Sequence, residues 1–259
     1  MGESDRWRVN PDKELRLAQI DPGATPGVPG DRVAIEAAQP GLHAELSELQ
    51  ARLWAEARRA LLVVLQGLDA AGKDGTIKHV FLGVNPLATR AVAFKEPTPE
   101  EATHDFLWRV HAHCPAAGQI GIFNRSHYED IVAVRVRRLA EPEVWKQRYG
   151  LINAFESILA HGGTTTIKIY LHISPEEQLR RLDERRDIPD KRWKLRPSDW
   201  DDRQHWDEFQ AAYQDALRLT STPTAPWYVV PSNHKWYRNW AVSRILIDTL
   251  TRMDPRYPR

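Results

Sequence analysis

The chain has 259 residues, 42% of them hydrophobic and 27% charged, which is enough for one α/β domain with a sizeable core. A formal net charge of +1 gives no argument for nucleic acid or a membrane surface as a bulk partner, and we expect neither; no apolar run approaches the roughly 18 residues that a membrane-spanning helix needs. The single cysteine, Cys114, excludes an intrachain disulfide and suits a reducing compartment, so we expect a cytoplasmic protein.

Residues 1–40 are predicted to form an N-terminal arm and linker, and residues 41–259 the main domain. The arm is charged and weakly periodic, and the stretch 21–31 (DPGATPGVPGD) is rich in proline and glycine, which disfavour regular structure. From residue 41 to residue 59, leucines recur at helical spacing. This pattern predicts a helix that buries one leucine stripe: Leu42, Leu46, Leu49 and Leu53.

Beyond this helix, short apolar segments alternate with helical ones. The predicted strands are LLVVLQ (61–66), ATRAVAF (88–94), QIGIF (119–123), TTTIKIYLHI (164–173) and PWYVVP (226–231). The predicted helices are a segment after residue 72 and the stretches 98–111, 142–160, 175–186, 198–219 and 236–252. Alternation of this kind predicts a three-layer α/β fold with a central parallel sheet, helices on both faces and ligands at the carboxyl ends of the strands.

A glycine-rich loop follows the first strand. The segment Gly67-Leu-Asp-Ala-Ala-Gly72-Lys73 matches the spacing G-x-x-x-x-G-K between a buried strand and a helix. Glycines in such a loop let consecutive amides turn toward anionic oxygens, and the lysine adds a full charge. We therefore expect a P-loop that binds a phosphate chain through residues 67–75, including Gly67, Ala70, Ala71, Gly72, Asp74 and Gly75.

The loop departs from the common P-loop at Asp74, where a Ser or Thr hydroxyl would normally meet Mg²⁺. Asp69, inside the loop, can place a carboxylate beside the phosphates, and Mg²⁺ prefers one or two carboxylates together with phosphate oxygens and water. We interpret Asp69 as the metal ligand. The alternative is a turn-forming aspartate that hydrogen-bonds within its own loop.

Polar residues also follow a second strand, in the segment GIFNRSHYED (121–130). Arg125 offers a planar fork to phosphate or base, and Glu129 or Asp130 is expected to hold metal or recognise the acceptor. Ser126 followed by Glu129 also fits a capping box, so part of this pattern can serve to start a helix.

A basic lid is predicted at about residues 180–200. Between residues 180 and 196 there are eight basic residues against four acidic ones. Such a segment is expected to close over a phosphate chain, neutralise charge and exclude water. The alternative for any single arginine is a solvated helix face with ion pairs.

A further cluster, His111, His113 and Cys114, lacks a second ligand pair at zinc spacing, so we assign no metal to it.

With these segments identified, the sequence resembles the polyphosphate kinase 2 family from about residue 40 to the C-terminus. The blocks that carry the resemblance are LQGLDAAGKDGTIKHVF, FNRSHYED, RRLDERRDIPDKRWK and APWYVVPSNHKWYRNW, in this order. The resemblance implies a P-loop kinase core with a helical lid, in which inorganic polyphosphate reversibly donates a phosphoryl group to a purine nucleoside mono- or diphosphate. It also implies Mg²⁺, or Mn²⁺ in its place, and a homo-oligomer, either a dimer or a tetramer.

Carried over position by position, the resemblance gives catalytic roles to Asp69, Lys73 and Arg125, and metal binding to Asp69 and Asp130. It places Asn124, Glu129 and Asp130 beside the nucleotide. The residues that it implies for polyphosphate binding in the lid are Arg180, Arg181, Arg185, Arg186, Lys191 and Lys194.

One departure concerns the acceptor. Members that act mainly on diphosphates have an aspartate where Asn124 stands here, and the form Asn-Arg-Ser-His-Tyr-Glu-Asp resembles the subgroup that accepts both AMP and ADP.

Two other functions would use the same loop: an ATP-dependent kinase of another small acceptor, and a module that binds nucleotide or polyanion without turnover. Clustered carboxylates beside phosphate argue against the second, because such charges are costly to bring together without a cation.

Overall fold

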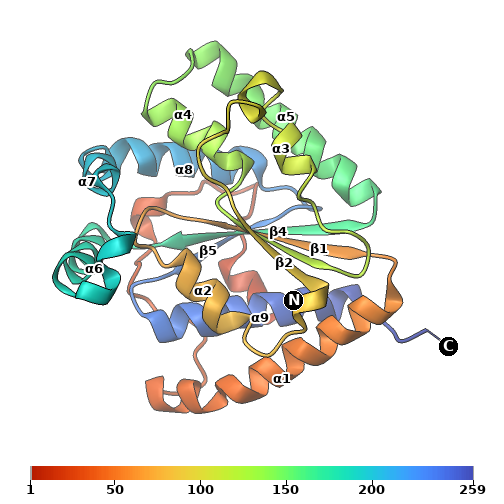
Figure 1. Ribbon diagram of the computed structural model, residues 1–259. Helices are drawn as coiled ribbons and strands as arrows, with labels where there is room; N and C mark the ends of the chain where they lie inside the picture. Colours follow the sequence, from red (N-terminus) through yellow and green to blue (C-terminus); the bar gives the residue numbers. More distant parts are fainter. Residues whose placement is uncertain (1, 259) are drawn as a thin grey trace.

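The computed structural model describes residues 2–258 and contains one parallel five-stranded sheet (Figure 1). The strand order is β2-β3-β1-β4-β5. The strands are β1 (Ala60–Gln66), β2 (Thr89–Ala93), β3 (Ile120–Asn124), β4 (Thr164–His172) and β5 (Trp227–Pro231). All five predicted strands are therefore confirmed, with bounds that agree to within about one residue.

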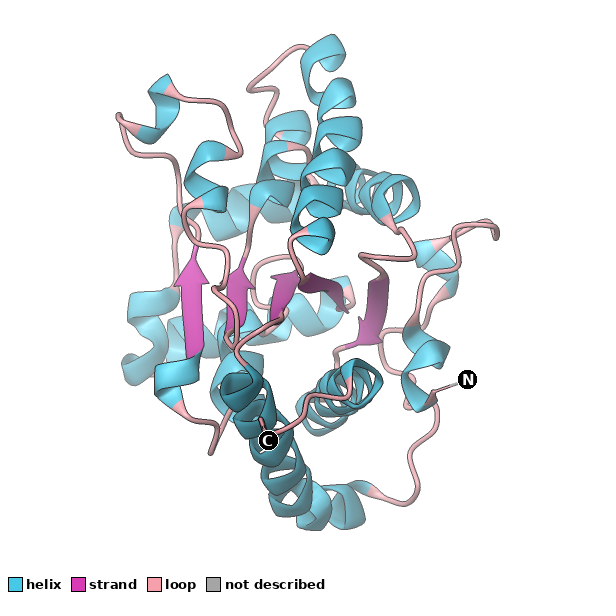
Figure 2. Cartoon of the chain, turned by 90° about the vertical axis from the view of Figure 1, so that its right-hand side faces the viewer, coloured by secondary structure: helices cyan, strands magenta, loops and turns pink. Residues whose placement is uncertain are grey.

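Helices cover both faces of the sheet, which confirms the three-layer α/β fold (Figure 2). On one face lie α1 (Arg32–Glu56), α2 (Lys73–Val80) and α9 (Lys235–Met253). On the other lie α3 (Trp108–His111), α4 (Val132–Val136), α5 (Pro142–His161) and α8 (Trp206–Thr220). Beyond the carboxyl end of β4 lie α6 (Pro175–Asp187) and α7 (Pro197–Gln204). Short 3₁₀ turns are η1 (Glu3–Trp7), η2 (Leu17–Gln19), η3 (Pro86–Ala88), η4 (Glu101–Thr103), η5 (His127–Asp130) and η6 (Pro189–Lys194).

The continuous apolar run of β1 follows from this layering. Leu61, Val63 and Leu65 pack into the core beneath α1 and α9, whereas Leu62 and Val64 pack into the core on the opposite face. Successive side chains of a strand point to opposite faces, so a central strand between two layers of helices is apolar at every position.

Three helix bounds differ from the prediction. The first helix begins at Arg32 rather than near residue 41, because Asp31 accepts a hydrogen bond from the amide of Ala34 and Ile35 is buried in the core. The stretch 98–111 is not one helix, since the backbone at His104 is extended (φ −105°, ψ 174°) between η4 and α3. The stretch 198–219 is divided into α7 and α8 at His205.

The N-terminal arm packs against the edge of the sheet at β5. The amide of Val9 donates to the carbonyl of Trp227 at 2.8 Å, and Trp7 donates through its indole nitrogen to the hydroxyl of Tyr237 at 2.9 Å. The arm thereby covers β5, whose outer edge would otherwise present unpaired backbone groups. Within residues 2–258, no helix is both long and apolar enough to cross a bilayer.

Candidate active site

The phosphate loop joins β1 to α2 and depends on glycine at two positions. Gly67 has φ 152°, and a Cβ there would lie 3.0 Å from the carbonyl oxygen of Leu171 on the adjacent strand. Gly72 has φ 109°, and Ala70, at φ 64°, also adopts the left-handed region. Such backbone geometry lets a loop turn its amides inward, and strain of this kind is typical of binding sites.

Lys73 is the first residue of α2 and lies inside the loop. Its side chain is buried, and Nζ lies 2.6 Å from the carbonyl oxygen of Gly67 and 3.3 Å from that of Leu68. Burial and the nearby Arg125 lower the pKa of Lys73, against the opposing effect of Asp69. The ammonium group is therefore held at the centre of the loop, where a phosphate would supply negative charge.

Asp69 and Arg125 connect the loop to the end of β3. A guanidinium nitrogen of Arg125 donates to Oδ1 of Asp69 at 2.6 Å. Burial by itself raises the pKa of Asp69, but Lys73 and Arg125 outweigh it and leave this pKa below its ordinary value. Burial would lower the pKa of Arg125, but Glu129 and Asp69 raise it above its ordinary value. Both groups are consequently charged at neutral pH.

Asn124 and Asp74 form a second link between the same two elements. Nδ2 of Asn124 donates to Oδ1 of Asp74 at 2.6 Å. Asp74, in the first turn of α2, thus has a neutral amide as its partner rather than a second carboxylate. Asn124 at the end of β3 therefore orients the carboxylate of Asp74, the residue that departs from the common P-loop.

These residues line one cavity of about 930 Å³ between the loop, the end of β3 and the lid. The predicted residues that line it are Asp69, Ala70, Gly72, Lys73, Asp74, Gly75, Asn124, Arg125, Arg181, Arg185, Lys191 and Lys194. The predicted residues that do not line it are Gly67, Ala71, Glu129, Asp130, Arg180 and Arg186. The structure therefore brings together two strand ends and the lid around one polar space.

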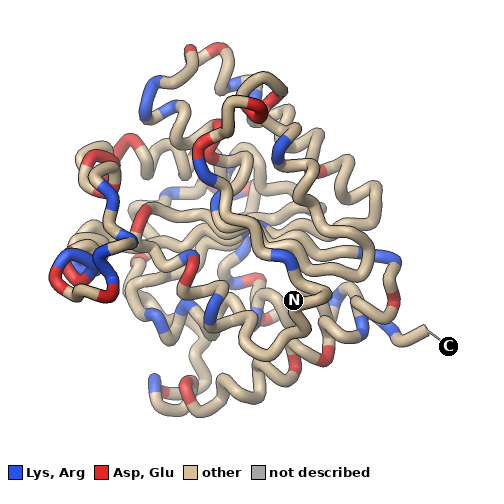
Figure 3. The backbone as a smooth tube through the Cα atoms, in the orientation of Figure 1, with Lys and Arg blue, Asp and Glu red and all other residues tan. Residues whose placement is uncertain are grey.

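The lid arginines are not equivalent. Along α6, arginines are interspersed with Asp and Glu (Figure 3), and each of these arginines has a carboxylate partner. Arg180 is exposed and pairs with Glu177 and Glu184, and Arg186 is exposed and pairs with Asp183 and Asp187.

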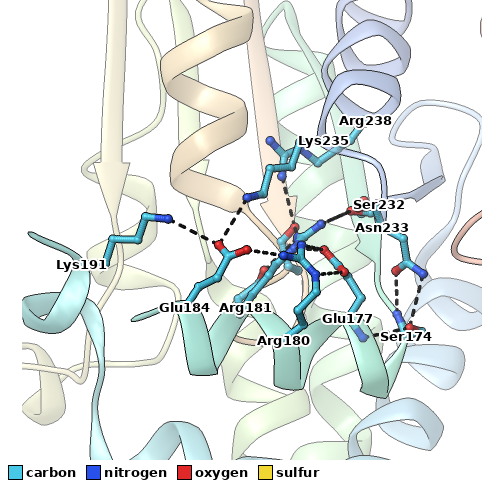
Figure 4. A network of polar contacts seen from close by, with 12 residues as sticks. Ser174, Glu177, Arg180, Arg181, Glu184, Lys191, Ser232, Asn233, Lys235 and Arg238 are labelled. Carbon is cyan, nitrogen blue, oxygen red and sulfur yellow. Dashed lines mark hydrogen bonds and ion pairs between the residues drawn. The ribbon is translucent and has the colours of Figure 1, made fainter. Parts of the chain in front are cut away.

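Arg181, by contrast, is buried and holds the phosphate loop in place (Figure 4). Its guanidinium donates to the carbonyls of Ala70 and Ala71 at 3.0 and 2.9 Å, and to those of Ser232 and Asn233 at 2.6 and 2.9 Å. The lid helix is thereby attached to the loop and to the chain after β5. Its Nε also donates to Oε1 of Glu177 at 2.7 Å, so Arg181 joins a carboxylate of its own helix to four main-chain carbonyls around the loop.

Asp130 lies beside two arginines rather than beside the loop. Its carboxylate is 3.7 Å from Arg148 and 4.0 Å from Arg109. Burial raises the pKa of Asp130 to about 6, although both arginines lower it. Ser126 accepts a hydrogen bond from the amide of Tyr128 and begins the short turn η5. Neither Glu129 nor Asp130 on this turn lines the cavity, although Glu129 is near enough to raise the pKa of Arg125.

Several residues of the cavity were missed by sequence reasoning: Lys78, His79, Asp199, Lys235 and Arg238. Lys235 and Arg238 lie in the first turn of α9, directly after β5. The basic residues in SNHKWYRNW, placed just after the last strand, were the available signal, because all carboxyl ends of a parallel sheet share one edge.

The donor groups fit a hard cation that also binds substrate phosphates. In the part of the chain from residue 2 to residue 258, no group of three or more His, Cys, Asp or Glu is arranged to hold a metal ion by itself. Asp69 and Asp199 both line the cavity, and burial, followed by the proximity of Asp69, raises the pKa of Asp199. One or two carboxylates completed by phosphate oxygens and water is the set that Mg²⁺ prefers.

Cys114 is half-buried, and burial raises the pKa of its thiol to about 11, so this thiol is protonated at neutral pH.

Comparisons with known proteins agree with this geometry. A family model described as Polyphosphate kinase 2 matches residues 31–258. A curated relative, the AMP/ADP-polyphosphate phosphotransferase of Meiothermus ruber, is 50% identical over 254 residues, which cover 98% of this chain and 95% of the relative. The ADP-polyphosphate phosphotransferase of Rhodopseudomonas palustris is 40% identical over 225 residues, which cover 82% of this chain and 78% of the relative. The crystal structure of Polyphosphate Kinase 2 from Arthrobacter aurescens TC1 superposes with a TM-score of 0.96 at 41% identity, covering all of this chain and 92% of that one.

Proposed function

The chain belongs to the polyphosphate kinase 2 family, and we propose that it transfers phosphoryl groups from inorganic polyphosphate to nucleoside mono- and diphosphates. The observation that carries this proposal is the single cavity in which the phosphate loop faces basic side chains of the lid. A space lined by loop amides, Lys73 and lid cations suits an anionic chain longer than one phosphate.

In the proposed reaction, most of the catalysis is positioning and charge stabilisation. The loop amides and Lys73 hold phosphate oxygens, and Arg125 stabilises charge on the transferred group while keeping Asp69 in place. Among the lid residues, Arg185, Lys191 and Lys194 are assigned to the donor chain because they line the cavity. Asp69 is the first candidate to hold Mg²⁺, which would supply neutralisation of charge between donor and acceptor phosphates.

For the acceptor we propose AMP and ADP. The relative that is 50% identical is named an AMP/ADP-polyphosphate phosphotransferase, and the one that is 40% identical an ADP-polyphosphate phosphotransferase. Asn124 supports a range of acceptors that includes both AMP and ADP. Its side chain is a neutral amide, so Asp74 supplies the one carboxylate in the contact between these two residues.

We also propose that the enzyme acts in the cytoplasm as a homo-oligomer, without nucleic acid or membrane as a partner. Support for assembly comes from the outer face of α5, where Val144, Leu151 and Ile158 are exposed at seven-residue spacing. Size-exclusion chromatography with light scattering gives the mass directly, and a monomer at micromolar concentration would contradict the oligomer.

The experiment that tests the function is a matrix of donors against acceptors with and without Mg²⁺. We expect ADP and ATP to form from polyphosphate with AMP or ADP, only in the presence of the divalent cation. Turnover with ATP and another small acceptor, but none with polyphosphate, would identify an ATP-dependent kinase instead. Binding without any turnover, unchanged by removal of Mg²⁺, would identify a binding module.

A further inference from the structure

Arg238 lies in the first turn of α9, against the phosphate loop. Its side chain is only 2% exposed, and Nη1 is 3.4 Å from the carbonyl oxygen of Ala71. A Cβ on Gly72 would lie 1.9 Å from the same nitrogen, so glycine at this position makes room for the guanidinium. In Figure 4, Arg238 on α9 and Arg181 on α6 approach the loop side by side from two different helices.

This buried guanidinium has no counter-charge in the part of the chain that the structure describes. Among residues 2–258, no carboxylate lies within ion-pair distance of Arg238, and its remaining hydrogen bonds go to the side-chain oxygen of Asn239 at 2.9 and 3.2 Å. Its neighbour Arg181 is also basic. Burial, followed by repulsion from Arg181, lowers the pKa of Arg238 to about 9.

Arg244, farther along the same helix, shows the usual arrangement. It is 25% exposed and lies 2.9 Å from Glu3, 3.7 Å from Asp248 and 3.9 Å from Glu45. A buried charge without such partners destabilises a fold, often by several kcal/mol. The environment of Arg238 is therefore incomplete by one negative charge.

The missing charge is available on the cavity side. Arg238 lines the cavity, and its Nη2 is 3.4 Å from the point that a Cβ on Gly75 would occupy. Its two terminal nitrogens thus lie along the part of the loop that begins α2, where helix amides also favour an anion. A planar guanidinium is suited to two oxygens of one phosphate.

We propose that Arg238 is a phosphate-binding residue of this site, and that its counter-ion is the phosphate chain seated on the loop between Gly72 and Gly75. The inference rests on the proposed function for the nature of the chain, and on the structure for the missing charge. Ligand binding would complete an ion pair that the protein alone leaves open.

Replacing such a residue has an effect that replacing a merely structural arginine lacks. The stability of the ligand-free protein should increase, whereas phosphate binding should weaken. In Arg238→Met the uncompensated charge is gone, so we expect a higher melting temperature without ligand. The same variant should lose most of the rise in melting temperature that tripolyphosphate causes in the wild type. Its KM for polyphosphate should increase at least tenfold.

Arg244→Met is the matched control, because it removes a paired arginine from the same helix. We expect it to melt at a lower temperature but to keep the stabilisation by tripolyphosphate and the KM for polyphosphate. Arg238→Lys, which keeps the charge but not the fork, should fall between wild type and Arg238→Met in its response to tripolyphosphate.

An unchanged tripolyphosphate response and an unchanged KM in Arg238→Met would overturn the proposal. If Arg238→Met does not fold, Arg238→Lys decides in the same way, and an affinity equal to that of the wild type overturns it. Failure of the proposed function gives a different result. If the wild type turns over no polyphosphate but its stabilisation by tripolyphosphate requires Arg238, the proposed activity is refuted and this phosphate site is supported.

Discussion

A guanidinium nitrogen of Arg125 lies 2.6 Å from Oδ1 of Asp69, and this contact joins the end of β3 to the phosphate loop. Arg125 reaches this position with a left-handed backbone (φ 62°), held by a hydrogen bond of 3.0 Å from its amide to the carbonyl of Leu65. Strain of this kind is maintained by its surroundings and is common at functional sites. The contact keeps the Asp69 carboxylate ionised and fixed in direction before a cation or substrate binds.

The first prediction concerns Asp69→Asn. The variant keeps the shape of the side chain but loses the charge that we assign to the metal, so we expect kcat to fall by about 100-fold or more and the Mg²⁺ concentration for half-maximal rate to rise. Initial rates with polyphosphate and ADP over a Mg²⁺ titration measure both. Asp215→Asn, which removes a surface partner of Arg135, is the control and should leave both unchanged. A normal Mg²⁺ titration in Asp69→Asn would show that the metal is held elsewhere.

The second prediction separates two adjacent arginines. Arg181→Lys leaves buried carbonyl oxygens of the loop without donors, and we expect a loss of about 2–4 kcal/mol in the free energy of unfolding. Arg180→Lys affects exposed ion pairs and should change it by about 0.5 kcal/mol or less. Urea denaturation of the two variants side by side is the measurement. Equal losses would mean that the buried hydrogen bonds of Arg181 contribute little.

The third prediction is a pH dependence at Asp130. Its pKa in the folded protein, about 6, lies above the ordinary value near 3.8, so its protonation favours the fold. This contribution is fully present at low pH and is lost as the pH rises toward and through 6. Asp130→Asn should therefore gain stability relative to the wild type by about 2 kcal/mol more at pH 7.5 than at pH 4.5. Denaturant unfolding at both pH values tests this, and a difference that is the same at each would count against it.

The fourth prediction concerns a buried ion pair away from the cavity. Lys168 on β4 and Glu156 on α5 are almost fully buried, with Nζ 2.5 Å from Oε2. Lys168→Met leaves the carboxylate without its cation and should cost about 3–5 kcal/mol. The double variant Lys168→Met/Glu156→Leu should recover part of that loss. If the double variant is no more stable than Lys168→Met, the pair does not act as a unit.

The fold and the centre of the site were accessible from the sequence because their signals are local. β1 is apolar from Ala60 to Leu65 since helices cover both faces, and the spacing from Gly67 to Lys73 follows the strand. Asp69, Asn124 and Arg125 could be placed at one edge because all strands of the sheet are parallel.

Other features depend on contacts that a sequence does not contain. Arg180 and Arg181 are adjacent in a basic segment, yet successive residues of a helix point about 100° apart, so one faces solvent and the other the loop. Asp130 follows Glu129 directly, but the turn η5 directs it to Arg109 and Arg148. The position of Arg238 after the last strand was a signal in the sequence, but the lack of a carboxylate partner for it is visible only in the packed structure.

The most direct test of the whole account is the initial rate of ADP and ATP formation from polyphosphate and AMP by the wild type and by Lys73→Met. If the loop ammonium stabilises the transferred charge, the wild type turns over and Lys73→Met, still folded by circular dichroism, is slower by about 100- to 1,000-fold. A folded Lys73→Met that retains the wild-type rate would contradict the account.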